Sequence, residues 1–298
     1  MLPHCRTPAW PADLDPGRFA SRIRTKSPEG CRVGLIGLAD DHGIRLNRGR
    51  QGAAEGPRAF RAALARYGAA DAPGPDRPLV FDAGDVVGVP GEDLAAMHHR
   101  VTDATKAMLD LGLLPVAIGG GHDLTYPFVR AVATHTHQSM VGVYFDAHLD
   151  VREAVGSGMP FRRLIEDGSA RSLHVHGLDR LAADQTHLHW FQAHGGHAEF
   201  DTTPDDPWPE GDLFVSLDLD VIDQAHAPGV SAMNPAGWSA QEAQRWVAAA
   251  GRHPRVRCFD IMELSPPHDE NGRTARLAAH LFLTFLRGLG ERPRTPRE

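Results

Sequence analysis

The chain is poor in cysteine, has no excess of positive charge and contains no long apolar run. Its three cysteines, Cys5, Cys31 and Cys258, are odd in number and far apart among 298 residues, so we expect ordinary cytosolic thiols and no disulfide framework. The 31 basic and 38 acidic residues give a net charge of −7, which does not favour nucleic acid as a partner. No apolar run approaches membrane-spanning length, and the N-terminus lacks the apolar core of a signal peptide. We therefore expect a soluble cytoplasmic protein that binds neither nucleic acid nor a membrane.

Short apolar runs alternate along the chain with longer segments of helical apolar spacing. The runs expected to be strands are 32–37, 79–81, 114–118, 140–145, 172–175, 213–217 and 256–261. The segments expected to be helices are 56–67, 93–112, 124–134, 239–250 and 274–289. This alternation predicts an α/β fold with a mainly parallel sheet covered by helices on both faces. No linker or repeat divides the chain, so we predict a single domain over residues 1–298, with an ordered core of about residues 30–290.

Polar side chains follow three of the expected strands, at the edge where chemistry is concentrated in open parallel sheets. GGGHD follows the strand at 114–118, DAHLD follows the one at 140–145, and DLD follows the one at 213–217. In an extended chain the two-residue spacing within DAHLDVR would put its acids, its histidine and its arginine on one face. Together the three motifs supply four carboxylates and two imidazoles: His122, Asp146, His148, Asp150, Asp218 and Asp220.

This set of carboxylates predicts bound cations. A single acid after a strand is more often a solvated turn residue, but four carboxylates brought together repel one another unless positive charge lies between them. Ligation rich in oxygen, with one imidazole per ion, suits Mn²⁺ better than tetrahedral Zn²⁺. Two such ions roughly 3.5 Å apart would share a water, lower its pKa and produce a hydroxide nucleophile. We therefore predict two Mn²⁺ ions per subunit.

GGGHD, DAHLD, SLDLDVID and DIMEL, in this order, resemble the four signatures of the ureohydrolase (arginase/agmatinase) superfamily. The match runs from about Gly52 to about Ala279. The resemblance implies a three-layer α/β/α sandwich with an arginase-like, mainly parallel sheet of about eight strands, and a homo-oligomer. It further implies that one Mn²⁺ is held by His122, Asp146, Asp150 and Asp218. The other would be held by Asp146, His148, Asp218 and Asp220.

The same resemblance implies that the protein hydrolyses C–N bonds of amidines. Glu263, in DIMEL, matches the glutamate that pairs with the cationic amidinium and orients its carbon toward the hydroxide. Asp150 would carry a proton from the attacking water to the leaving nitrogen. Asp260 is interpreted as a residue that orients the metal ligands or His122. The remaining histidines, among them His187, are interpreted as surface or core residues.

The loop after the second motif indicates the substrate. Arginases carry a histidine there, whereas GSGMPFRRL (156–164) has Ser157 or its neighbour in that place and resembles the loop of formimidoylglutamases. This implies hydrolysis of the formimino C–N bond of N-formimino-L-glutamate to L-glutamate and formamide, in histidine degradation. Other amidines remain alternatives, with a guanidino-acid hydrolase, an agmatinase or an arginase-like enzyme on the same site. A zinc deacylase would lack some of the six ligands, and a metal-stabilised binding protein would not need Glu263.

The substrate named above carries two carboxylates. Arg152 would bind one of them, and Arg162 or Arg163, in the loop that also offers Ser157, would bind the other. A structural salt bridge is the alternative for Arg152, and solvation is the alternative for the two loop arginines. The chain departs from the usual subfamily sequence at Met159, Met233 and Ser265. The roles of Asn47, Arg48 and Arg50, in a loop after the first strand, stay open between reaching the site and simple solvation.

Overall fold

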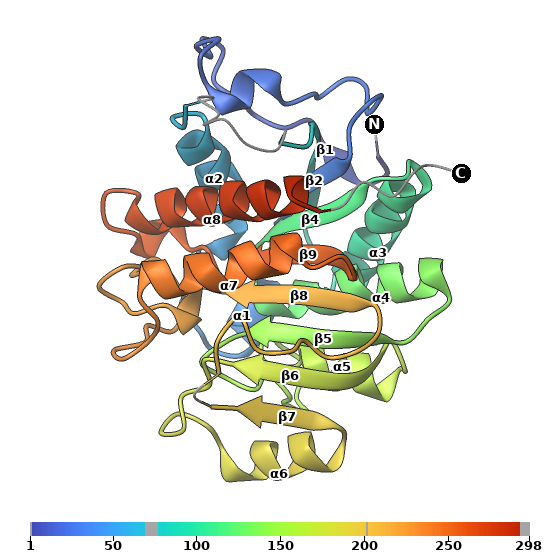
Figure 1. Ribbon diagram of the computed structural model, residues 1–298, viewed down its shortest axis with the longest axis vertical. Helices are drawn as coiled ribbons and strands as arrows, with labels where there is room; N and C mark the ends of the chain where they lie inside the picture. The colour runs from blue at the N-terminus through green and yellow to red at the C-terminus, as the bar shows by residue number, and fades with distance from the viewer. Residues whose placement is uncertain (1, 69–76, 201, 293–298) are drawn as a thin grey trace.

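The protein is built around one central sheet with helices on both sides (Figure 1). The computed structural model describes residues 2–68, 77–200 and 202–292. The strands are β1 (Cys5–Arg6), β2 (Val33–Ala39), β3 (Val80–Val87), β4 (Leu114–Gly119), β5 (Met140–Phe145), β6 (Ala170–His176), β7 (Gly196–Glu199), β8 (Leu213–Asp218) and β9 (Val256–Met262). They pair in the order β1-β3-β2-β4-β9-β8-β5-β6-β7, with only β1 antiparallel to its neighbour among the described strands. The predicted α/β fold with a mainly parallel sheet is confirmed.

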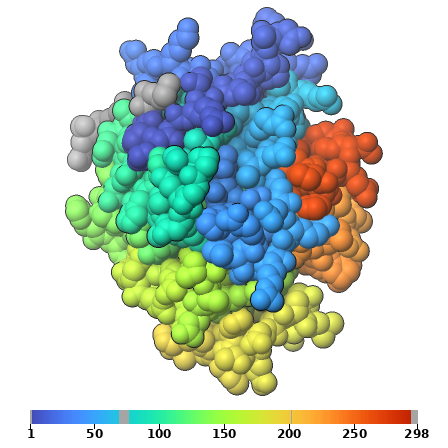
Figure 2. All heavy atoms as spheres, turned by 180° about the vertical axis from the view of Figure 1, so that it is seen from behind, coloured from blue at the N-terminus to red at the C-terminus, as the bar shows by residue number. Residues whose placement is uncertain are grey.

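The helices divide between the two faces of this sheet. They are α1 (His42–Leu46), α2 (Gly56–Leu64), α3 (Leu94–Asp110), α4 (Thr125–Thr136), α5 (Pro160–Glu166), α6 (Gln185–Ala193), α7 (Ala240–Arg252) and α8 (Arg273–Gly290). Helices α2, α7 and α8 pack together on one face, whereas α3, α4 and α5 pack together on the other. Figure 2 shows the second face, with the teal and green segments of α3 and α4 at the surface. None of the described helices is long and apolar enough to cross a membrane.

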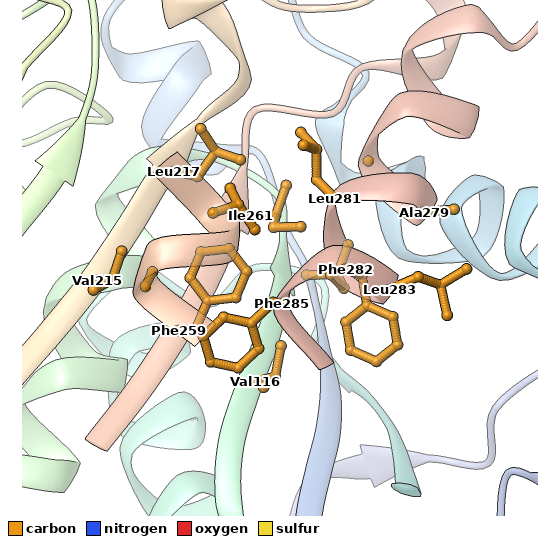
Figure 3. Packing of buried hydrophobic residues seen from close by; sticks show 14 of the residues in the cluster. Val116, Val215, Leu217, Phe259, Ile261, Ala279, Leu281, Phe282, Leu283 and Phe285 are labelled. Atoms are coloured by element: carbon orange, nitrogen blue, oxygen red, sulfur yellow. The ribbon is translucent and has the colours of Figure 1, made fainter. Parts of the chain in front are cut away.

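Side-chain alternation along the strands produces two cores. Leu35 points into the core beneath α2, α7 and α8, and its neighbour Ile36 points into the core beneath α3 and α4. Continuous apolar strands such as β5 follow from this arrangement, because both of their faces are buried. Figure 3 shows the first core, where α8 lies over β8, β9 and β4. Phe285 of α8 stacks on Phe259 of β9 with ring centroids 4.4 Å apart.

All seven predicted strands and all five predicted helices are present, with ends shifted by three residues or fewer except at β3, which was predicted over 79–81 and continues to Val87. Two strands were missed: β1 has only two residues, and β7 reads GHAE, without the apolar alternation that marks a strand. The predicted loop over 156–164 is wrong from Pro160 onward, because Pro160 opens helix α5. The prediction of a single domain stays a prediction.

The order of the strands creates a natural position for a site. Strands β1 to β4 occupy one side of the sheet and β5 to β7 the other, and the last two strands of the chain, β8 and β9, are inserted between β5 and β4. The carboxyl ends of β4, β9, β8 and β5 therefore lie next to one another, at the point where the winding direction reverses. Each of these four ends carries one of the motifs GGGHD, DIMEL, SLDLD and DAHLD.

Candidate metal centre

The six predicted ligands lie together beyond these four strand ends and form two adjoining groups. His122, Asp146, Asp150 and Asp218 make up the first group, and Asp146, His148 and Asp220 make up the second. Within each group the candidate ligand atoms all lie within 4.8 Å of one another. Asp146 belongs to both groups, so its carboxylate is placed to bridge them. Asp218 falls only in the first group, although the resemblance implies that it bridges as well.

In the first group the imidazole of His122 faces three carboxylates. Its Nδ1 lies 3.0 Å from an oxygen of Asp150, 3.0 Å from one of Asp218 and 3.3 Å from Asp146 Oδ2. In the second group His148 Nδ1 lies 3.1 Å from Asp220 Oδ2 and 3.4 Å from Asp146 Oδ1. The two oxygens of Asp146 thus face different imidazoles, as a bridging ligand requires.

Turns bring these side chains together, and the predicted extended geometry is wrong here. Strand β5 ends at Phe145, and Asp146 Oδ1 then accepts the N–H of His148 at 2.6 Å. Strand β8 ends at Asp218, which accepts the N–H of Asp220 in the same manner at 2.8 Å. Each first aspartate closes a turn on the backbone two residues later, which leaves its second oxygen free for other partners. Asp150 then takes a left-handed backbone with φ of 47°.

The chemistry of this cluster fits bound cations. Three buried atoms at its centre lack a hydrogen-bond partner among the described residues: His122 Nδ1, Asp146 Oδ2 and Asp220 Oδ1. Burial raises the pKa of Asp218 well above its ordinary value, and the charge of Asp220 adds to this effect. Burial also raises the pKa of Asp220 to about 6, although His148 opposes the shift. Buried carboxylates of this kind need positive charge to stay ionised, and a cation between them would satisfy the unpartnered atoms.

A series of hydrogen bonds behind the ligand cluster orients the imidazole of His122. Its Nε2 lies 3.0 Å from Ser216 Oγ, and the Ser216 hydroxyl donates to Asp260 Oδ1 at 2.5 Å. Thr125 donates to the other oxygen of Asp260 at 3.1 Å. Because the Ser216 hydroxyl is committed to Asp260, its oxygen accepts from Nε2–H, which leaves the Nδ1 lone pair facing the carboxylates. Asp260 therefore acts on His122 through Ser216, whose role was not predicted from the sequence.

Glu263 lies beside the cluster at the end of β9. The residue is 3 % exposed, and its backbone is left-handed with φ of 67°. Glu263 Oε1 accepts the backbone N–H of His122 at 2.9 Å, and Oε2 accepts the hydroxyl of Ser231 at 2.6 Å. Burial raises the pKa of Glu263 to about 8, although these two hydrogen bonds favour the ionised form. Left-handed backbone at a non-glycine residue is uncommon, and here it occurs at both Asp150 and Glu263.

The metal cluster opens into a cavity of about 310 Å³. Asp150, Asp220 and Glu263 line its inner part together with His148 and Asp218. The outer part is lined by Asn47, Arg152, Ser157 and His187 among others. His187 of α6, predicted to be a surface or core residue, is a surface residue that lines this cavity.

The loop that carries Ser157 is held to the segment after β2. The Ser157 backbone N–H donates to Gly43 O at 3.0 Å, and Asn47 Nδ2 donates to Ser157 Oγ at 2.9 Å. The Ser157 hydroxyl hydrogen is left available to an acceptor in the cavity. Asn47 therefore helps to build the cavity wall. Arg48, with a left-handed φ of 59°, is exposed and does not line the cavity.

The two neighbouring arginines do not enter this cavity, contrary to their predicted role. Arg162 lies on α5, where its Nε pairs with Glu166 at 2.7 Å and its guanidinium lies over the ring of Trp190. Arg163 also pairs with Glu166, at 2.8 Å. The segment 156–164 contacts the site through Phe161 instead, whose ring packs edge-on against that of His122 with centroids 5.2 Å apart.

A parallel α/β sheet with two adjoining imidazole–carboxylate groups at its carboxyl edge is the arrangement of a hydrolase with a binuclear metal centre. The chain belongs to the arginase family, whose model matches residues 31–287. It is therefore an arginase-family hydrolase that acts on linear amidines, and this family uses a binuclear metal centre.

Relatives and solved structures agree with this placement. The chain is 33% identical to a formimidoylglutamase of Rhodococcus jostii (strain RHA1), over 92% of this chain and 93% of the relative. Its structure is similar to that of Trypanosoma cruzi formiminoglutamase with Mn²⁺, with a TM-score of 0.83 and 29% identity, over 94% of this chain and 100% of that one. The formimidoylglutamase of Bacillus subtilis gives a TM-score of 0.84 at 26% identity, with 96% of each chain covered.

Proposed function

We propose that the protein is a dimanganese hydrolase that cleaves the formimino C–N bond of N-formimino-L-glutamate to give L-glutamate and formamide. Two Mn²⁺ ions would be held by the six side chains described above, of which Asp146 belongs to both ligand groups. When bound, the ions supply Lewis acidity and a water of lowered pKa for attack on the amidine carbon. The relatives and solved structures named above, which bear the name of this activity, support the proposal.

Glu263 would bind the cationic amidinium at the inner end of the cavity. Each of its two oxygens has one protein donor, so each keeps a lone pair for a bidentate pair with the two N–H groups of the substrate. Asp150 would transfer a proton to the leaving nitrogen. Its side chain is 14 % exposed and lines the cavity, so it can contact both the cluster and a bound substrate.

The free guanidinium of Arg152 is the observation that carries the choice of substrate. Arg152 lines the cavity and is exposed, and among the described residues its side chain has no ion pair or hydrogen bond. The alternative that Arg152 forms a structural salt bridge is therefore wrong. An unpaired arginine beside a buried metal cluster suits a substrate with a carboxylate, to which it can donate two parallel hydrogen bonds. The Ser157 hydroxyl would donate to the same end of the substrate.

Other amidines are the alternatives on the same metal centre. A guanidino acid would also use Arg152, whereas agmatine has no carboxylate and would gain nothing from it. An arginase-like activity would present both a carboxylate and an amino group to the outer cavity. Oligomeric state and cellular compartment stay predictions.

A substrate panel tests this proposal. Mn²⁺-loaded protein is assayed with formiminoglutamate, guanidinobutyrate, agmatine and arginine side by side. We expect the highest kcat/KM with formiminoglutamate, and we expect Arg152→Ala to raise KM by at least tenfold with little change in kcat. Arg180→Ala, at an exposed arginine outside this cavity, is the control. Turnover of agmatine or arginine with formiminoglutamate inert would reject the proposed substrate.

A further inference from the structure

Two residues outside the metal cluster hold the carboxylate of Glu263 in place. Ser231 follows β8 in the segment APGVSA, and its hydroxyl donates to Glu263 Oε2 at 2.6 Å. Arg50 lies in the segment after α1, about 180 residues earlier in the chain. Its Nε donates to Ser231 O at 3.0 Å, and one terminal nitrogen donates to Val230 O at 2.6 Å. Arg50 is partly buried and bonded to these two carbonyls, so of the two alternatives left open for it, simple solvation is wrong.

These contacts form a continuous chain from one loop to the other. A planar guanidinium bonded to two consecutive carbonyls fixes the orientation of that peptide, and with it the direction of the Ser231 side chain. Glu263 is held from the other side by His122 N–H, and its own N–H donates to Gly120 O at 2.9 Å. Its left-handed backbone persists only because the surrounding contacts determine it.

We infer that Arg50 and Ser231 are positioning residues that aim Glu263 at the amidinium group of the substrate. This inference rests on the proposed function for the identity of the ligand. Ser231 donates to Oε2 and His122 N–H donates to Oε1, so each oxygen keeps one lone pair for one N–H group of a planar amidinium. Without the Ser231 hydroxyl, the carboxylate can rotate about its last torsion and present only one oxygen.

The direct probe is the guanidinium ion, which carries the planar N–H pair and nothing else of the substrate. Its dissociation constant is measured by titration calorimetry on the Mn²⁺-loaded full chain. We expect Ser231→Ala to weaken guanidinium binding by about tenfold, because a hydrogen bond to a charged group is lost. Ser231→Thr, which keeps the hydroxyl, is expected to restore binding to within about threefold. The number of Mn²⁺ ions bound per chain is expected to stay the same in both variants.

Arg50 is tested through its dependence on Ser231. Arg50→Ala alone is expected to weaken guanidinium binding by roughly the same factor as Ser231→Ala, and the double variant is expected to be no worse than either. Arg45→Ala, at an exposed arginine of α1, is the matched control and is expected to leave binding unchanged. If the effects of Arg50→Ala and Ser231→Ala multiply, Arg50 does not act through Ser231. If Ser231→Ala binds guanidinium like the wild type, the inference is overturned.

The same variants separate this inference from the proposed function. The proposed function fails if the wild-type protein turns over none of the amidines in the panel, whatever its affinity for guanidinium. The positioning role fails if guanidinium affinity, and the kcat/KM of whichever amidine is hydrolysed, are unaffected by Ser231→Ala. Thermal unfolding identifies any variant that does not fold, in which case Ser231→Cys, which keeps the side-chain size and donates weakly, replaces Ser231→Ala.

Discussion

Ser216 Oγ lies 3.0 Å from His122 Nε2 and links that imidazole by hydrogen bonds to a buried carboxylate. The carboxylate belongs to Asp260, whose pKa is raised to about 6 by burial, although the hydrogen bonds from Ser216 and Thr125 favour its ionised form. In many metal sites a carboxylate contacts the ligating histidine directly. In this protein a serine hydroxyl stands between them, and the sheet explains why: Ser216 and Asp260 are register partners on the adjacent strands β8 and β9.

Removing this hydroxyl should weaken metal binding. Ser216→Ala frees the Nε2 side of His122, so the ring can rotate or take the other tautomer. We expect the affinity for Mn²⁺ to fall by about 10- to 100-fold, as measured by calorimetric titration of chelator-treated protein. Ser239→Ala is the control, since Ser239 caps helix α7 by accepting the N–H of Glu242. That variant should lose about 1 kcal/mol of stability and keep its Mn²⁺ affinity.

Metal removal should change stability through Asp146. Mn²⁺ that binds only the folded protein raises the melting temperature, so we expect a chelator to lower it and two equivalents of Mn²⁺ to restore it. Asp146→Asn removes the carboxylate shared by both ligand groups and should bind fewer than two ions. Differential scanning fluorimetry against Mn²⁺ concentration provides the measurement. Asp110→Asn, at an exposed acid, should titrate like the wild type; an equal response in Asp146→Asn would contradict the bridging role.

The sequence indicates which residues converge at this site but does not indicate their geometry. His122, Asp146 and Asp218 could be found because strand ends and motif order are local properties of the chain. The ligands converge because Asp146 and Asp218 each accept the backbone N–H of the residue two positions later, which closes a turn. The left-handed backbone of Asp150 cannot be predicted from the two-residue spacing of the motif. The predicted carboxylate contact of Arg162 is wrong because Pro160 begins helix α5, on which Arg162 pairs with Glu166.

The sequence does not predict the role of residues whose contacts lie far away along the chain. Arg50 contacts the segment at Val230 and Ser231, and no local pattern links two loops so far apart. His187 reaches the cavity because α6 follows β6 across the carboxyl edge of the sheet, which a helical period cannot indicate. The short polar strand β7 could not be predicted for a related reason. It forms by pairing with another strand of the sheet and has no apolar pattern of its own.

A buried ion triad away from the metal centre should contribute more to the free energy of unfolding than an exposed ion pair on the same helix. Arg61 of α2, with its side chain 2% exposed, pairs with Asp82 at 2.7 Å and with Asp85 at 2.5 Å on β3. Arg61→Met would leave Asp82 buried without its cation, and we expect a loss of about 3–5 kcal/mol in the free energy of unfolding by urea. Arg58→Ala removes an exposed pair on the same helix and should cost less than about 1 kcal/mol. Equal losses in the two variants would contradict this assignment.

His176 should make stability depend on pH in weakly acidic solution. It lies beside Trp246 with ring centroids 4.4 Å apart, and its Nδ1 lies 2.8 Å from Thr202 Oγ1. Burial lowers its pKa to about 4; Glu199 and Asp206 oppose this shift, and His174 adds to it. The unfolded chain, with an ordinary histidine pKa near 6.5, therefore binds more protons than the folded protein between pH 4 and 6.5. The contribution of His176 is fully present above pH 6.5 and is lost as the pH falls toward 4.

His176→Gln removes this titration. In metal-free protein we expect the free energy of unfolding to fall less steeply in the variant than in the wild type between pH 6.5 and 4. The difference between the two should change by up to about 3 kcal/mol over this range. Urea unfolding at half-unit steps of pH measures it, and His189→Gln, at an exposed position of α6, is the control. Parallel pH profiles for His176→Gln and the wild type would mean that His176 is protonated as readily in the folded protein as in the unfolded chain.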